Sequence, residues 1–84
     1  MKTMGIYLRE KRELKGLTQA QVAEQLGYGS PQFISNIERG VSRVPIKSLK
    51  YFIELYGLMA HEVIEIILDE RRRQLKKYLG INDG

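Results

Sequence analysis

The side chains that could act as nucleophiles, general bases or metal ligands do not form a catalytic pattern in this sequence. The chain has one histidine and no cysteine, which excludes disulfides, thiolate sites and a pair of histidine ligands to zinc within one chain. His61 and Glu62, followed by Glu65, form an incomplete HExxH pattern, because its second histidine is a glutamate. No phosphate-binding loop is visible. We therefore expect no enzyme, no metal site and no cofactor.

Charged side chains are arranged in blocks along the chain. The formal net charge is +4, from 14 Lys and Arg against 10 Asp and Glu. Residues 16–38 contain no Lys or Arg, and residues 39–50 carry four basic groups and no acid. Residues 51–70 carry five acids and no Lys or Arg, and residues 71–77 carry five basic groups. The basic excess weakly favours a polyanionic partner, and its distribution places cations beside a nearly uncharged stretch.

Length and hydropathy indicate a single domain, 1–84. The hydrophobic content of 43% is ordinary for a globular protein. No apolar run approaches the roughly 18 residues of a membrane span, and the first residues lack the apolar stretch of a secretory signal. We therefore expect a cytoplasmic protein without a membrane partner. No long segment alternates with period two, so the fold class predicted is all-α.

Capping signals mark the first two of five predicted helices. The first should run from about Thr3, its N-cap, to Lys15. The second, 18–26, has the clearest start, because Thr18 and Gln21 fit a capping box. Its expected buried side consists of Ala20, Val22, Ala23 and Leu26.

The other three helices follow at short intervals. The third, 31–39, should begin at Ser30 and Pro31, an N-cap followed by a proline whose φ suits a first turn. The fourth should run from near Pro45 to Gly57, and the fifth, 60–79, is long for so small a domain. The first half of the fifth is apolar enough to be buried nearly all round. Its apolar residues are Val63, Ile64, Ile66, Ile67 and Leu68.

The second and third predicted helices, joined by a short glycine-containing turn, have the helix-turn-helix plan. The strings GLTQAQVAEQLG (16–27), PQFISNIERG (31–40) and PIKSL (45–49) carry a closer likeness. Through them residues 4–58 resemble the Cro/repressor-type helix-turn-helix family, also called the xenobiotic-response-element family. The resemblance implies a five-helix, lambda-repressor-like domain with an extended C-terminal helix. It also implies binding to double-stranded DNA as a dimer, with the third helix in the major groove.

The resemblance also assigns architectural roles. Arg12 and Glu38 match a buried ion pair between the first and third helices. Loss of one partner would strand a buried charge, so we interpret this pair as structural. The positions that match the packing residues of the family are Ala20, Ala23, Leu26, Ile34 and Ile37.

The third helix should bury one face and present the other to DNA. The candidates for base contacts are Gln32, Phe33, Ser35 and Asn36. Glutamine and asparagine can each make a bidentate contact to adenine, and Gln32 and Asn36 lie one turn apart on the same face. Phe33 has two interpretations of equal weight: it contacts a thymine methyl group, or it packs back on the turn at Tyr28.

Phosphate contacts are expected on both sides of the third helix. Such contacts set the register of a protein on DNA and do not determine its sequence specificity. The candidates are Gln19, Ser30, Arg39, Arg43 and Lys47. For Lys47 the alternative is a solvated helix face.

The C-terminal helix carries more apolar side chains than a monomer of this size requires. Dimerisation would supply the two half-sites that such motifs read, and the candidate interface residues are Tyr51, Ile66, Ile67, Leu75 and Tyr78. The basic segment 71–77 has three interpretations: a solvated helix end, a pairing surface for the acidic residues 62–70, or a contact to nucleic acid.

The sequence therefore predicts a repressor-like transcriptional regulator that binds a two-half-site operator as a homodimer. The alternative is an antitoxin or restriction-modification controller that also binds a protein partner, and the long fifth helix makes that role credible.

Overall fold

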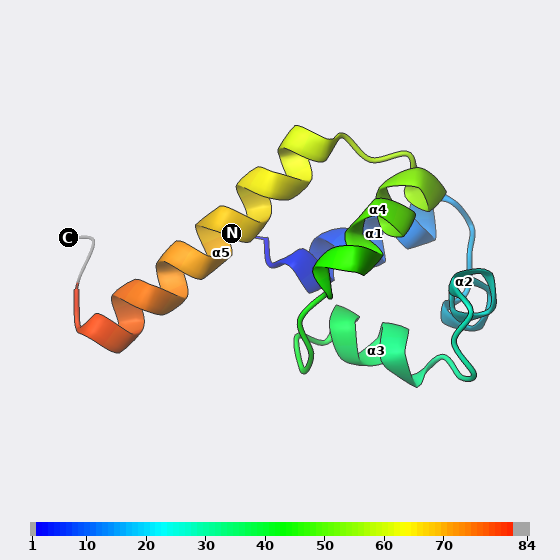
Figure 1. Cartoon of the computed structure of the whole chain (residues 1–84), viewed down its shortest axis with the longest axis horizontal. Helices are drawn as coiled ribbons and strands as arrows, with labels where there is room; N and C mark the ends of the chain where they lie inside the picture. Colours follow the sequence, from blue (N-terminus) through cyan, green and yellow to red (C-terminus); the bar gives the residue numbers. More distant parts are fainter. Residues whose placement is uncertain (1, 82–84) are drawn as a thin grey trace.

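The computed structural model describes residues 2–81, which form five helices without a strand. These are α1 (Met4–Leu14), α2 (Gln19–Leu26), α3 (Gln32–Glu38), α4 (Ile46–Tyr56) and α5 (Ala60–Leu79). Figure 1 shows the first four gathered at one end of an elongated molecule, with α5 running away from them. The all-α fold class expected from the sequence is confirmed.

Side-chain caps begin the first two helices at the predicted residues. The Thr3 hydroxyl accepts a hydrogen bond from the Ile6 amide at 3.2 Å. At α2, the Thr18 hydroxyl accepts from the Gln21 amide at 3.1 Å, and Gln21 Oε1 accepts from the Thr18 amide at 2.8 Å. The two bonds complete a capping box, which satisfies amides that the first turn leaves without partners.

The third helix begins one residue later than predicted. Pro31 has helical angles (φ −72°, ψ −5°), but its carbonyl accepts the first intrahelical bond, from Ser35 at 3.0 Å, so Pro31 is the N-cap. The Ser30 hydroxyl still accepts from the Gln32 amide, at 3.4 Å. At the other end Gly40 has φ +77°, and the Val41 amide donates to the Asn36 carbonyl, which closes the helix.

The core lies around α1, which packs against α3, α4 and α5. Its buried hydrophobic residues are Met4, Tyr7, Leu8, Val22, Ala23, Ile34, Ile37, Phe52, Tyr56 and Val63. Ala20 is exposed, contrary to both roles expected for it, and Leu26 is half-buried. The inward side of α2 is centred on Val22 and Ala23, and steps of about 100° per residue turn Ala20 towards solvent.

Gly5 allows α1 and α3 to approach closely. A Cβ atom at this position would lie 2.7 Å from the Glu38 carbonyl oxygen and closer still to that of Ile37. A glycine in the interior of a helix usually costs stability, and here it permits backbone contact. No local sequence pattern marks this position, because the atoms that require a glycine belong to α3.

α5 has one half inside the fold and one half outside it. Val63 is buried, and Ile66 and Ile67 are half-buried against the core. Ile64 and Leu68 are 48% and 51% exposed, so the expectation of burial nearly all round is wrong. A single face of the helix meets α1 and the remaining faces meet solvent.

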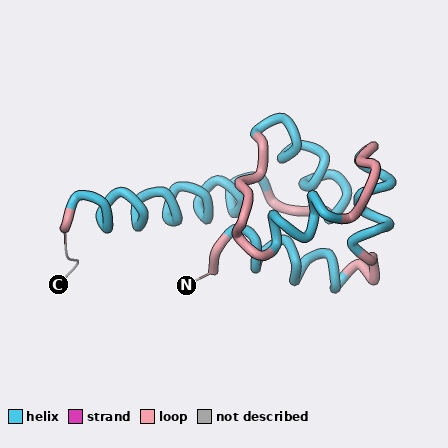
Figure 2. Tube along the Cα trace, turned by 90° about the horizontal axis from the view of Figure 1, so that it is seen from below, coloured by secondary structure: helices cyan, strands magenta, loops and turns pink. Residues whose placement is uncertain are grey.

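Two contacts anchor α5 to the start of the chain. Glu70 Oε2 accepts a hydrogen bond from the Met4 amide at 3.2 Å, and Arg73 Nη2 donates to the Lys2 carbonyl at 3.4 Å. The Glu70 carboxylate therefore lies at the N-terminus of α1, where a negative charge is favourable. Beyond Arg73 the helix projects from the body (Figures 1 and 2), and the molecule measures 42 × 24 × 21 Å.

Candidate nucleic-acid interface

A buried ion pair fixes α3 on α1. Arg12 Nε donates to Glu38 Oε2 at 2.7 Å, and Arg12 Nη2 donates to Glu38 Oε1 at 3.1 Å. The Glu38 side chain is 3% exposed, and hydrogen bonding to it raises the pKa of Arg12 although burial acts in the opposite direction. Arg12 Nη1 also donates to the Leu17 carbonyl at 2.8 Å, just before α2. The two residues that the resemblance paired therefore lie together.

Gln19 adds the second helix to this network. Its Nε2 donates to Glu38 Oε1 at 3.0 Å, so the first residue of α2 is bonded to the last residue of α3. We expected Gln19 to contact the DNA backbone, but its side-chain amide is bound to Glu38 and half-buried. A buried carboxylate needs several donors to offset its lost hydration, and Gln19 supplies one. The side chain positions α3 instead of extending outward.

The outward face of α3 carries a connected row of polar groups. Gln32 is exposed, and Ser35 and Asn36 are half-buried. Gln32 Nε2 donates to Asn36 Oδ1 at 2.8 Å, and Arg39 Nη2 donates to the same oxygen at 2.9 Å. The candidate base-reading amides are therefore side by side. Arg39, expected at a phosphate, contacts Asn36 in the free protein.

Phe33 belongs to the turn between α2 and α3. Its ring stacks on Tyr28 with centroids 4.1 Å apart and planes 27° apart. The Tyr28 hydroxyl lies 3.1 Å from the Ser48 hydroxyl, which ties the turn to α4. The second interpretation of Phe33 is thus the one observed, and we remove it from the base-contact candidates. Stacking on a neighbouring ring buries apolar surface that the groove-facing position would leave in water.

Two exposed cations follow α3 in the chain. Arg43 lies in the α3–α4 loop and Lys47 in the first turn of α4, and both are exposed. Neither forms a hydrogen bond or ion pair with another residue in the range 2–81 that the structure describes. Ser30, at the other end of α3, is exposed as well. Ser30 therefore precedes α3 in the chain and the two cations follow it, and the Ser30 hydroxyl also accepts from the Gln32 amide.

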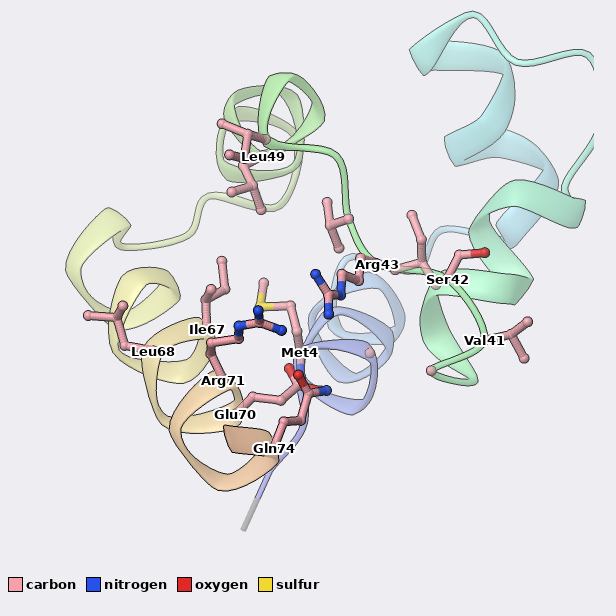
Figure 3. A pocket seen from close by; sticks show the side chains of 15 residues that line it. Met4, Val41, Ser42, Arg43, Leu49, Ile67, Leu68, Glu70, Arg71 and Gln74 are labelled. Carbon is pink, nitrogen blue, oxygen red and sulfur yellow. The ribbon is translucent and has the colours of Figure 1, made fainter. Parts of the chain in front are cut away.

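A mostly apolar cavity of about 460 Å³ separates the α3–α4 loop from α5. Figure 3 shows Arg43 reaching into it from the loop and Arg71 from α5, with Met4 of α1 between them. The apolar part of its wall includes Ile37, Val41, Val44, Ile46, Leu49 and Ile67. Across the described residues, no group of three or more His, Asp or Glu side chains could hold a metal ion. In the same part of the chain, no helix combines the length and apolar character of a membrane span.

The candidate dimer residues fall into two groups. Tyr51, Leu75 and Tyr78 are 59%, 46% and 89% exposed and remain available to a partner. Ile66 and Ile67 pack on the core instead, which is a correction to the expectation. α5 carries three further exposed apolar side chains, Ile64, Leu68 and Leu79. Their helical spacing with Leu75 was the signal in the sequence.

One comparison with known proteins, that with family models, agrees with this helix-turn-helix geometry. No curated protein and no solved structure matches the chain significantly. A family model described as a helix-turn-helix domain matches residues 3–65, well over half of the chain. This range contains α1 to α4 and the first turns of α5, with the buried Val63. The chain therefore belongs to the helix-turn-helix domain family, whose fold is typical of DNA-binding regulators.

Proposed function

We propose that this protein is a sequence-specific transcriptional regulator of the Cro/repressor type, which binds double-stranded DNA in the cytoplasm. One observation carries the proposal: α3 presents neutral amides on its outward face, and uncompensated cations follow it. The amides belong to Gln32 and Asn36, and the cations to Arg43 and Lys47. This arrangement matches a recognition helix in the major groove with phosphates beside it.

The division between neutral and charged groups suggests separate tasks. Amides and hydroxyls on α3 would read base edges, which differ between base pairs in the major groove. Arg43 and Lys47, with the Ser30 hydroxyl, would bind phosphates and set the register. The Arg12–Glu38 pair and Gln19 would hold α3 at a fixed angle to the rest of the domain.

A homodimer is supported by an exposed apolar stripe on α5. Ile64, Leu68, Leu75 and Leu79 are between 46% and 70% exposed. With successive residues about 100° apart on a helix, they lie within about 60° of one another. The stripe faces away from Val63, the residue that α5 buries in the core. An apolar stripe of this kind on a soluble protein indicates a partner.

The spacing of the stripe is symmetric, and this favours a second copy of the chain as that partner. In an antiparallel pair centred between residues 71 and 72, Leu68 lies opposite the partner's Leu75. In the same register Ile64 lies opposite the partner's Leu79. A twofold interface has to be self-complementary in this way. Arg71 and Arg72 fall at the centre, where their long stems can cover apolar surface while the charged heads stay in water.

Charge favours the same antiparallel direction. The acidic residues 51–70 precede the basic residues 71–77 along the chain. An antiparallel pair sets the acidic part of one α5 beside the basic part of the other, whereas a parallel pair sets like charges together. This register uses the basic segment as a pairing surface, one of its three interpretations.

Selection of bound DNA from a random pool tests the proposed function. We expect a recovered site with two related half-sites, about 34 Å or a multiple of it between their centres. Recovery of random sequences at every salt concentration would contradict sequence-specific binding. A single unrepeated half-site would contradict the dimer while leaving specific recognition intact.

A further inference from the structure

Gln32, Asn36 and Arg39 form one hydrogen-bonded row along α3. Gln32 Nε2 and Arg39 Nη2 both donate to Asn36 Oδ1, at 2.8 and 2.9 Å. Their spacing of four and then three residues places them on one helix face. Arg39 is therefore bound to an amide that the proposed function assigns to base reading.

The arginine determines which way the Asn36 amide points. A guanidinium has only N–H donors and no acceptor, so the Asn36 atom that it contacts must be the oxygen. The Gln32 atom that contacts the same oxygen must then be the amide nitrogen, which is the donor of that side chain. The orientation of both amides follows from the chemistry of Arg39.

In this orientation Asn36 can only donate. A carboxamide oxygen has two lone pairs, and Gln32 and Arg39 each occupy one. The Nδ2 group carries two N–H donors, and no hydrogen bond from it to another residue of the described range is present. A ligand that meets Asn36 therefore meets donors alone.

We propose that Arg39 sets the base specificity of Asn36 by holding its amide in this orientation, so that Asn36 selects guanine over adenine. The inference rests on the DNA-binding function proposed above. Guanine presents two acceptors, N7 and O6, in the major groove. Adenine presents N7 beside an amino group, which needs an acceptor that the bound Asn36 no longer offers. The adenine contact expected from the sequence requires an asparagine whose oxygen is free.

A positioning role for Arg39 differs measurably from a phosphate contact. A phosphate contact strengthens binding to every sequence. A residue that orients Asn36 changes which base is preferred at one position. The ratio of affinities for guanine and adenine at that position therefore separates the two roles.

The first experiment compares Arg39→Met with Arg43→Met on the selected operator. Each change removes one positive charge and keeps an unbranched apolar stem, and both residues are exposed, so circular dichroism should show folded proteins. Titrations would use operators with each base in turn at each position, at several salt concentrations. Asn36→Ala identifies the position that Asn36 contacts, because discrimination disappears there.

We expect the two variants to differ in one respect. Arg43→Met should lower affinity for all operators and leave the guanine-to-adenine ratio unchanged. Arg39→Met frees an Asn36 lone pair and should shift this ratio towards adenine on the order of tenfold, as expected for one bidentate contact. Wild-type preference for adenine at the Asn36 position would overturn the inference. An unchanged ratio in Arg39→Met would also overturn it.

Asn36→Asp provides a second variant. It keeps an oxygen for Arg39 and Gln32 but replaces the free donor by an acceptor. Preference should move to a base that presents an amino group at this position, which is cytosine or adenine. Retained guanine preference would overturn the inference. A wild-type protein with no preference at any position would instead contradict the proposed function itself.

Discussion

Arg12 and Glu38, 26 residues apart in the chain, are joined by two parallel hydrogen bonds of 2.7 and 3.1 Å. The pair links α1 to α3, and Gln19 adds a third donor from α2. Three helices therefore meet at one carboxylate. The orientation of α3 on α1 and α2 depends on this side chain.

Removal of one partner should destabilise the domain strongly. Arg12→Ala leaves Glu38 buried without its charged partner, and such losses cost about 3–5 kcal/mol. Urea unfolding followed by circular dichroism measures the difference. Arg9→Ala is the matched control, because Arg9 forms a surface ion pair. Its side chain is 63% exposed, and its Nε lies 3.8 Å from Glu13 Oε2. Arg9→Ala should cost at most about 1 kcal/mol. Equal losses for both variants would contradict the role of the buried pair.

Gly5→Ala tests the close approach of α1 and α3. The added Cβ would clash with backbone carbonyl oxygens of Ile37 and Glu38, so the helices must separate. We expect a loss of about 1–3 kcal/mol, as for other overpacked sites, although alanine is the better helix former. Gly29→Ala is the control, because a Cβ at Gly29 meets no atom within 4 Å. A neutral or stabilising effect of Gly5→Ala in thermal unfolding would refute the contact.

Tyr56 should contribute to loss of stability at alkaline pH. Its hydroxyl is buried and has no hydrogen-bond partner among the described residues. Burial chiefly, and then the charge of Glu38, raise the pKa of Tyr56, with Arg12 acting in the opposite direction. The folded state therefore holds this proton more tightly than the unfolded state. The contribution of this proton to folding stability is fully present below the pKa of about 10 that tyrosine has in the unfolded state. It declines as the pH rises through that value.

Tyr56→Phe removes that titration and keeps the ring. Near pH 7 we expect stability within about 1 kcal/mol of the wild type, because the lost hydroxyl has no partner. Above about pH 10 the variant should lose less stability than the wild type. Urea titrations on both sides of that pH measure the change. Tyr78→Phe is the control, because the Tyr78 side chain is 89% exposed. If Tyr56→Phe and the wild type lost the same stability at alkaline pH, ionisation of Tyr56 would be excluded as a cause.

Asn36→Ala and Arg43→Ala should affect DNA binding differently. Asn36→Ala should relax preference at one base position by about 1–3 kcal/mol. Arg43→Ala should weaken binding to all sequences and reduce the salt slope by about one. Titrations of matched and single-substitution operators at several salt concentrations measure both effects. Equal, sequence-independent losses from both variants would contradict the assignment of roles.

Leu75→Gln should dissociate the proposed homodimer. Leu75 lies within the α5 stripe, opposite the partner's Leu68 in the antiparallel register. We expect the dimer dissociation constant to rise about tenfold or more, measured by sedimentation equilibrium over a range of concentrations. Met59→Gln is the control, because Met59 is 70% exposed but lies outside the stripe. A monomeric wild type at all concentrations would refute the homodimer and leave the stripe to a different protein.

Local signals predicted the helices well because their causes are local. Thr3 and Thr18 cap the helices that the sequence predicted them to begin. Gly57 and Gly80 adopt positive φ where α4 and α5 end. Each signal depends on hydrogen bonds within a few residues. Tertiary packing then stabilises these short helices, which would be marginal in isolation.

Positions that depend on distant partners were harder to predict. Gln19 looked like an outward-facing residue, but the acceptor for its amide, Glu38, is 19 residues away in sequence. Ala20 has the residue type of a packing position, and its exposure depends on the angle at which α2 meets the core. The importance of Gly5 depends on carbonyl groups of α3. Periodicity identifies a helix face but does not identify what that face meets.

The hydrogen bond from the Met4 amide to Glu70 has a consequence for the order in which the domain can form during synthesis. The ribosome makes α1 before α5, yet the acceptor for this amide and the buried Val63 both come from α5. A nascent chain that stops before residue 60 leaves part of α1 exposed to water, without the helix that covers it. α1, although translated before α5, is therefore covered late, and the domain should reach its native packing only after most of α5 has left the ribosome.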